Sequence, residues 1–355
     1  KAWRSESERR LKKRYKINEV WKKILQIRIN IAKNAKHDNY RSWRWEYLNR
    51  FDYTPDDCLD FHSAIEKVVM PFANKLIKKR KDELGLKTLK PWDLSVDTLN
   101  RTPLKPFKNA DELEMKCHNI FNSVDSELGN YFKIMRDEKL LDLANRKGKA
   151  PGGYCTEYHH RRVPFIFMNA VGTHSDVQTM LHEGGHAFHV FESNQLPYSA
   201  QRDVGMEFAE VASMSMELLS APYLTKEFGG FYEEEEAKRA RIEHLEKTIM
   251  FLPYMAVVDA FQHWAYTNPE MAIEPKNCDE RWTELWNRFQ VYDDLDSSEF
   301  KDVIATGWHN KLHLFHVPFY YVEYGMAQLG AIQVWGNALE NQKNAVKQYR
   351  HALSL

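Results

Sequence analysis

The chain has 355 residues, of which 43% are apolar and 13% are aromatic. That length and composition exclude a disordered chain and predict one large domain or two lobes with packed cores. Fifty basic residues balance fifty acidic ones. This zero net charge argues against nucleic-acid and membrane-surface binders, which usually carry a basic excess.

The cysteines and the hydropathy pattern indicate the cellular compartment. None of the four cysteines lies in a CxxC pair, and such sparse usage is typical of reduced thiols in a cytosolic protein. No apolar run approaches the roughly 20 residues that a membrane-spanning helix needs, and residues 1–16 lack the apolar core of a signal peptide. We therefore predict a cytoplasmic protein. Both ends fall inside helical patterns, as expected for part of a longer chain.

The first half of the chain has mostly helical patterns. The spacing of apolar residues predicts a helix over 18–35. Pro55, followed by two acidic residues, is typical of a helix start, and that helix is expected to continue to about Leu84. The prolines in 86–110 predict an extended loop. Helices are expected again over 111–145.

Strand patterns gather in one part of the sequence. A turn at 149–155 leads into a short strand, and the apolar run over 163–169 predicts a second. A helix is expected to follow from about Ser175 to Ser193. Further helices are predicted over 203–220, 231–267, 278–291 and 318–340. The sequence therefore predicts a mainly α-helical fold with a small β-sheet beside a central helix.

The central predicted helix carries the motif HExxH, in which His182 and His186 are four residues apart. Residues at this spacing lie above one another on a helix, so the two imidazoles can bind one metal ion. Glu183 follows the first histidine and can act as a general base toward a metal-activated water. Gly184 and Gly185 each cost about 1 kcal/mol relative to alanine in mid-helix. Close approach of another backbone or of a ligand is the expected reason.

A catalytic zinc site needs a third protein ligand. The metzincin pattern would require histidine at the position of Glu192, so that class is excluded. Glu207 and Glu210 lie one turn apart on a mostly apolar predicted helix, where an unpaired buried carboxylate is costly. We predict Glu210 as the ligand and Glu207 as a supporting residue, and two ordinary surface acids are the alternative. His189 is interpreted as a core or supporting residue rather than a ligand.

The chain resembles the thimet oligopeptidase and oligoendopeptidase F family of zinc metallopeptidases in HEGGHAFH and MEFAEVASMSMELL. The oligoendopeptidase F branch is favoured by GKAPGGYC, PFIFMNAVGTH, LPYMAVVDAFQHW and HVPFYYVEYGMAQLGA. The resemblance covers nearly the whole chain, and family members are longer at both ends. It implies a neurolysin-like zincin helical fold with one Zn²⁺ per chain. The implied ligands are His182, His186 and Glu210, with Glu183 as the base. The segment at 157–162 matches no signature of the family.

The resemblance also implies roles for residues near the C-terminal end of the chain. Stabilisation of the oxyanion is assigned to His313 and Tyr321. The alternatives in the same segment are Tyr320, Tyr324, His309 and His316. His309 is assigned to substrate binding. An aromatic core helix with surface histidines is the other interpretation of this segment.

Contacts with the substrate backbone are expected just before the HExxH helix. The strand over 165–169, which contains Phe167, is interpreted as an edge strand that an extended peptide can join. Gly152 and Gly153 are expected in a loop that closes over the peptide. Short peptides are therefore the predicted partners, without nucleic acid or membrane, and the oligomeric state is left open.

We predict a zinc metalloendopeptidase that hydrolyses internal bonds of short, unstructured peptides. Residues 1–148 are expected to form a helical lobe that walls the substrate channel, and residues 149–355 to form the zinc-binding catalytic region. The alternatives are a dipeptidyl carboxypeptidase or carboxypeptidase of similar fold, a peptide-binding fragment without turnover, and a metal-free helical scaffold. Cobalt or manganese can replace zinc in such a site in vitro.

Overall fold

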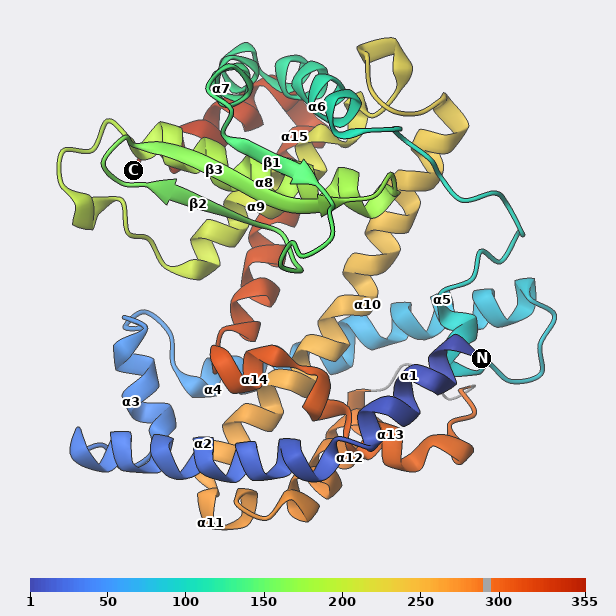
Figure 1. Ribbon diagram of the computed structural model, residues 1–355, viewed down its shortest axis with the longest axis vertical. Helices are drawn as coiled ribbons and strands as arrows, with labels where there is room; N and C mark the ends of the chain where they lie inside the picture. Colours follow the sequence, from blue (N-terminus) through green and yellow to red (C-terminus); the bar gives the residue numbers. More distant parts are fainter. Residues whose placement is uncertain (290–294) are drawn as a thin grey trace. The chain divides into compact units, whose positions relative to one another are not determined.

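The computed structural model describes residues 1–289 and 295–355 (Figure 1). This part of the chain is mainly helical and contains one three-stranded sheet, which confirms the predicted fold class. It divides into a first unit, Lys1–Arg101 with Glu246–Gly325, and a second unit, Thr102–Leu245 with Met326–Leu355. The predicted division after residue 148 falls inside the second unit. The separation into a channel-wall lobe and a catalytic region stays a prediction.

The first unit contains helices from two separate parts of the chain. They are α1 (Ala2–Leu11), α2 (Arg14–Asn34), α3 (Tyr40–Tyr47), α4 (Pro55–Ala64), α5 (Met70–Glu83), α11 (Pro269–Ala272), α12 (Pro275–Phe289), α13 (Lys301–Ala305) and α14 (Leu312–His316), with the end of α10 (Glu234–Thr267) and the start of α15 (Tyr321–Leu353). Its core is aromatic. The ring of Trp308 lies 5.3 Å from that of Trp21 and 5.8 Å from that of Phe261. Such large buried rings supply much of the apolar area that stabilises a helical unit.

The second unit places its helices around the sheet. Its elements are α6 (Ala110–Val124), α7 (Ser126–Asp137), β1 (Leu141–Ala144), β2 (Tyr154–Tyr158), β3 (Val163–Ala170), α8 (His174–Ser193) and α9 (Met206–Ser220), with the start of α10 and the end of α15. α8 packs along β2 and β3 and lies against α9 (Figure 1). Its buried residues join those of α6, α7 and the end of α15 in one hydrophobic cluster. The HExxH helix is therefore held from several sides.

The strand order is β1-β3-β2, with β3 parallel to β1 and antiparallel to β2. Phe167 pairs with Asp142 on one side and with Tyr154 on the other. The prediction that the strand containing Phe167 is an edge strand is therefore wrong, because β1 covers the side that was expected to be open. The segment at 157–162, which matches no family signature, forms the end of β2 and the turn into β3.

β1 lies where the sequence predicts helix over 111–145. The helical run breaks at Asp125, which caps α7 by accepting a hydrogen bond from the N–H of Glu127 at 2.9 Å. It ends at Lys139, whose φ of 56° turns the chain. Leu141–Ala144 then pairs with β3. A strand of four residues is too short for alternation to be visible, and its state is decided by the pairing partner.

Most other helix predictions agree with the structure. α4 continues through a π-helical stretch, Ile65–Val69, into α5, as expected for the helix after Pro55. The predicted helix over 318–340 begins at Tyr321, and its end agrees with the structure, because Asn341 has non-helical dihedral angles (φ −155°, ψ 91°); helix resumes after it to Leu353. The last two residues of the predicted helix over 278–291 lie outside the described residues. Within the described ranges, no helix is both long and apolar enough to cross a membrane.

Candidate metal centre

α8 begins at a carboxylate that accepts backbone hydrogen bonds. Oδ2 of Asp176 accepts the N–H groups of Val171 and Thr173 at 2.9 and 2.8 Å. An acidic residue in the first turn also interacts favourably with the positive end of the helix dipole. This anchor fixes the start of α8, and with it the position of the HExxH motif two turns later.

The two glycines of the motif explain how the neighbouring elements come close. A β-carbon at Gly185 would lie 2.5 Å from the carbonyl oxygen of Ala212 on α9. A β-carbon at Gly184 would lie 2.5 Å from the ring of Phe121 on α6. Glycine at both positions allows α9 and Phe121 to pack directly on α8, which is the physical reason for two glycines in mid-helix. The approach at Gly185 also brings Glu210 toward the histidines.

His182, His186 and Glu210 converge on one point. Nε2 of His182 and Nε2 of His186 lie 3.3 and 3.6 Å from Oε2 of Glu210. Each side chain offers one ligand atom, and the three atoms lie within 4.8 Å of one another. Two imidazole nitrogens and one carboxylate oxygen are the donor set of catalytic zinc sites that leave one coordination position open. The residues present therefore fit a zinc ion.

A further carboxylate, which the sequence prediction missed, holds His182. Oε1 of Glu217 lies 2.7 Å from Nδ1 of His182, and Oε2 of Glu217 lies 3.0 Å from Nε2 of His244. An imidazole that donates Nδ1–H to a carboxylate presents Nε2 to a metal. Glu217 follows Glu210 by seven residues on α9. This spacing repeats one helix face, and it is the sequence signal that points to Glu217.

Glu210, the candidate third ligand, is held by a neighbouring side chain. Ser213 Oγ donates a hydrogen bond to Oε2 of Glu210 at 3.0 Å. Glu207, which was predicted to support the ligands, is half-buried on the first turn of α9. Within the described ranges, no hydrogen bond or ion pair joins Glu207 to His182 or Glu210. Ser213 and Glu217 occupy the supporting positions instead.

His189 is a core residue in this structure. Its side chain is buried, and its ring lies edge-on to Phe208 with the centroids 5.5 Å apart. Burial lowers the pKa of His189 to about 4. A neutral, packed imidazole agrees with its interpretation as a core residue rather than a ligand.

The charges of the centre favour a cation. Burial lowers the pKa of His186 to about 4. Burial acts in the same direction on His182, but hydrogen bonds to Glu210 and Glu217 raise its pKa well above the ordinary value. Burial opposes ionisation of Glu217, yet the bonds to His182 and His244 lower its pKa to about 2. Two carboxylates thus lie beside the histidines in a buried site, where a divalent ion would be stabilised.

Glu183 lies beside the ligands and is only 6% exposed. Burial raises its pKa to about 7, although His182 and a backbone hydrogen bond from Cys155 of β2 oppose the shift. Oε2 of Glu183 is buried and has no hydrogen-bond partner in the part of the chain that the structure describes. A buried oxygen without a protein partner is expected to face a water or a ligand, as a general base does.

The loop predicted to contact substrate lies next to α8. A β-carbon at Gly153 would lie 3.2 Å from Cγ2 of Thr179 on that helix. Gly152 has φ +106°, a conformation that other residues rarely adopt. Asn169 Nδ2 donates hydrogen bonds to the carbonyl oxygens of Ala150 and Gly152 at 2.8 and 2.9 Å. The loop is therefore held by the start of β2 and the end of β3.

Phe167 is engaged with neighbours of the sheet. Its ring stacks on Tyr154 with the centroids 5.0 Å apart, and Nζ of Lys149 lies 4.4 Å from the ring centroid. These contacts give Phe167 a packing role in the sheet. A contact between Phe167 and substrate stays a prediction.

His313 and three tyrosines gather in the first unit. The ring centroids of Tyr320, Tyr321 and Tyr324 lie 6.0, 5.1 and 5.8 Å from that of His313. Tyr321 is 6% exposed, and its hydroxyl accepts a hydrogen bond from Lys311 at 3.0 Å. Tyr320 and Tyr324 are half-buried. The structure thus brings these four predicted residues together in one unit, while the metal centre belongs to the other.

The remaining histidines of this segment differ from each other. Nε2 of His309 lies 2.9 Å from Oδ1 of Asn18, and its ring centroid lies 4.1 Å from that of Trp308. Burial lowers the pKa of His309 to about 4. His316 is exposed. His309 is therefore a packing residue of the first unit, and its contact with substrate stays a prediction.

Comparison with known proteins identifies the family. The sequence model of Peptidase family M3 matches residues 1–355, which is the whole chain. The chain belongs to peptidase family M3. This M3 chain is 24% identical over 295 residues to an oligoendopeptidase F homolog of Borreliella burgdorferi, covering 79% of this chain and 46% of that relative. It is 23% identical over 322 residues to oligopeptidase PepF of Bacillus subtilis, covering 89% and 46%. The chain therefore spans about half the length of these curated relatives.

Solved structures agree with the M3 assignment. A structure of PZ peptidase A with an inhibitor matches with a TM-score of 0.89 and 30% identity, over 97% of this chain and 60% of that one. Oligoendopeptidase-F from Enterococcus faecium matches with a TM-score of 0.60 and 16% identity, over 99% and 56%. The second likeness shows the fold alone. The predicted resemblance to the oligoendopeptidase F family is confirmed.

Proposed function

We propose that this M3 chain carries the catalytic site of a zinc-dependent endopeptidase that hydrolyses internal bonds of short peptides. The observation that carries the proposal is the convergence of His182, His186 and Glu210 within 4.8 Å, beside the buried carboxylate of Glu183. The names of the relatives, oligoendopeptidase F and oligopeptidase, support peptides as the substrate class.

His182, His186 and Glu210 are the proposed zinc ligands. A zinc ion bound there would polarise the scissile carbonyl and lower the pKa of water toward neutrality. Glu217 orients the ring of His182, and Ser213 holds the carboxylate of Glu210. Such outer hydrogen bonds fix the direction of the ligands before the metal arrives.

Glu183 is the proposed general base. It accepts a proton from the attacking water and delivers it to the amine that leaves when the peptide bond breaks. A carboxylate whose pKa is raised by burial toward about 7 can both accept and return a proton near neutral pH. A nearby cation favours the ionised form, which is the form a base needs.

The substrate backbone is proposed to join β2 rather than β3. β3 is paired on both sides, whereas β2 is the outer strand next to α8. An extended peptide can add to an outer strand through main-chain hydrogen bonds. Gly152 and Gly153, at the start of β2, leave room for a peptide backbone because they carry no side chain.

Stabilisation of the oxyanion is proposed for the cluster around His313. A single well-placed donor of this kind contributes about 10²–10³ to kcat. Tyr321 was the first choice from the sequence, but its side chain is only 6% exposed. The half-buried Tyr320 and Tyr324 are therefore the favoured donors, together with His313.

The products of cleavage distinguish this proposal from its alternatives. The zinc-loaded chain is incubated with a short peptide that is blocked at both ends and internally quenched, and the fragments are weighed by mass spectrometry. Internal cleavage supports an endopeptidase. A second incubation uses the same peptide with a free C-terminus, which a carboxypeptidase or dipeptidyl carboxypeptidase needs. Cleavage of this peptide alone, from its C-terminal end, would replace the endopeptidase proposal with one of these two activities. Zinc binding without any cleavage would favour a peptide-binding role.

A further inference from the structure

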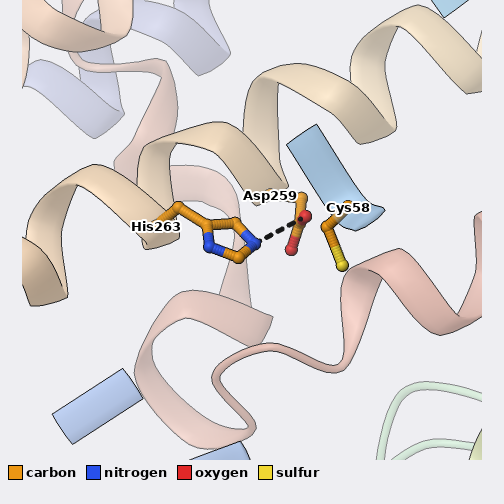
Figure 2. A group of neighbouring side chains, drawn as sticks. All are labelled: Cys58, Asp259 and His263. Atoms are coloured by element: carbon orange, nitrogen blue, oxygen red, sulfur yellow. Dashed lines mark ion pairs between the residues drawn. The ribbon is translucent and has the colours of Figure 1, made fainter. Parts of the chain in front are cut away.

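A second group of metal-binding side chains lies in the first unit. Cys58 comes from α4, and Asp259 and His263 come from α10. Each offers one ligand atom, and the three atoms lie within 4.8 Å of one another. Figure 2 shows the ring of His263 pointing toward the carboxylate of Asp259, with Cys58 beside that carboxylate. Their exposed fractions are 0%, 0% and 3%, so this is an interior cluster rather than a patch of surface residues.

Two of the ligand atoms are buried without a hydrogen-bond partner among the described residues. They are Oδ1 of Asp259 and Nε2 of His263. Nε2 of His263 lies 3.2 Å from Oδ2 of Asp259 along the dashed line of Figure 2, but the two groups are not aligned as a hydrogen bond. A metal ion bound by Oδ1 of Asp259 and Nε2 of His263 would give both of these buried atoms a partner.

His62 holds the carboxylate from the other side. It follows Cys58 by one helical turn on α4, and its Nε2 lies 2.9 Å from Oδ2 of Asp259. That contact leaves Oδ1 for a ligand, in the way that metal-binding carboxylates are commonly held by an outer hydrogen bond. Three aromatic rings lie 5.3, 5.8 and 6.2 Å from the two histidine rings: Phe319, Trp45 and Phe289. They shield the cluster from water.

We propose that Cys58, Asp259 and His263 bind a divalent ion of the zinc class, which ties α4 to α10 inside the first unit. A thiolate, a carboxylate and an imidazole suit Zn²⁺, whereas Mg²⁺ and Ca²⁺ prefer oxygen ligands alone. On binding, the S–H bond of Cys58 breaks, an S–metal bond forms, and the proton leaves to solvent. The thiolate and the carboxylate then balance the two positive charges of the ion.

Arg41 provides an internal marker of binding. Its Nη1 lies 3.3 Å from Nδ1 of His263. Because a guanidinium can only donate, Nδ1 is the acceptor in the metal-free cluster and Nε2 carries the hydrogen. A metal at Nε2 moves that hydrogen to Nδ1, so Arg41 must turn away. Arg41 is half-buried and is attracted by Asp56, which offers it another partner.

Sulfur is the signature that separates this site from the HExxH centre, whose proposed ligands are nitrogen and oxygen. The chain is produced in zinc-supplemented medium, its zinc content is measured, and X-ray absorption at the zinc edge reports the ligand atoms. We expect two zinc ions per chain and a sulfur shell at about 2.3 Å. The wild-type spectrum alone is informative, so the test does not depend on a variant that folds.

Two cysteine variants complete the test. Cys58→Ser is expected to lose the sulfur shell and one zinc per chain. Cys278→Ser is the matched control, because Cys278 is equally buried in the same unit but bonds to the carbonyl of Ala272 at 3.2 Å and is not one of the three clustered ligands. The Cys278→Ser control is expected to keep the sulfur shell and both zinc ions. Two results would overturn the site: one zinc per chain with only nitrogen and oxygen neighbours in the wild type, or a sulfur shell that persists in Cys58→Ser.

Discussion

Oε1 of Glu217 lies 2.7 Å from Nδ1 of His182, and this contact orients the first histidine of the HExxH motif. The same carboxylate contacts His244 at 3.0 Å through its other oxygen. α8, α9 and α10 are thus joined at the point where the proposed metal ligands converge. We expect the proposed centre to depend on this outer carboxylate as well as on the three proposed ligands.

Replacement of Glu217 is expected to weaken the metal centre. Glu217→Gln removes the charge that keeps Nδ1–H of His182 in place, and zinc affinity is expected to fall about 10–100-fold. Competition with a chromophoric chelator measures that affinity. Glu192→Gln is the control, because Glu192 lies on α8 but pairs with Arg350 at 2.6 Å. Equal zinc affinity of wild type and Glu217→Gln would show that this contact has no such role.

Gly185→Ala is expected to separate α8 from α9. The new β-carbon would lie 2.5 Å from the backbone oxygen of Ala212, and backbone cannot rotate away as a side chain can. We expect a loss of about 1–3 kcal/mol in the free energy of unfolding and weaker zinc binding. Gly336→Ala on α15 is the control, since among the described residues no atom outside the adjoining helix backbone lies within 4 Å of its β-carbon. Helix propensity predicts a gain of up to about 1 kcal/mol there. Urea unfolding that ranks the two variants in the reverse order would contradict this account of the motif.

Zinc affinity is expected to rise with pH. The pKa of His182 is raised well above its ordinary value by Glu210 and Glu217, so the metal-free centre holds a proton on His182 at neutral pH. Zinc must displace that proton, and apparent affinity should increase about tenfold per pH unit for each displaced proton until the pH passes that pKa. Titration calorimetry in buffers of different ionisation enthalpy counts the protons released. Constant affinity from about pH 6 to pH 8 would mean that His182 is already neutral.

The tyrosine cluster makes a prediction about rate rather than metal content. Tyr320→Phe or Tyr324→Phe is expected to lower kcat by about 10²–10³ with little change in bound zinc, because each removes one hydroxyl donor. Tyr321→Phe is expected to have the smaller effect on kcat, since Tyr321 is only 6% exposed whereas Tyr320 and Tyr324 are half-buried. Steady-state kinetics on one internally quenched peptide gives kcat for each of the three tyrosine variants. A dominant effect of Tyr321→Phe would restore the first choice from the sequence.

The sequence predicts that His182, His186 and Glu210 come together, because the signals for it are local. The spacing of His182 and His186 follows from one helix, and Glu210 lies in a segment that is distinctive for the family. Gly184 and Gly185 also break a local rule, and that break has its cause in the packing of Phe121 and α9. Such conflicts between local propensity and context are expected at functional sites.

Features that depend on partners far along the chain escape the same reasoning. β1 is a strand because Leu141 pairs with Ile166, and nothing within its four residues indicates this. The wrong edge-strand assignment for Phe167 follows from that omission. Glu207 and Glu217 lie on the same helix, and only the packing of α9 on α8 decides which of them supports His182.

The most direct test of the central claim compares wild type with Glu183→Gln. Glutamine keeps the size of the side chain but cannot accept the proton from water, so cleavage of an internally quenched peptide should fall by at least about 10²–10⁴. Zinc content should be unchanged, because Glu183 is not a proposed ligand. Full zinc with lost cleavage is the predicted result. Cleavage at the wild-type rate by zinc-loaded Glu183→Gln would contradict the assignment of the base and of the site.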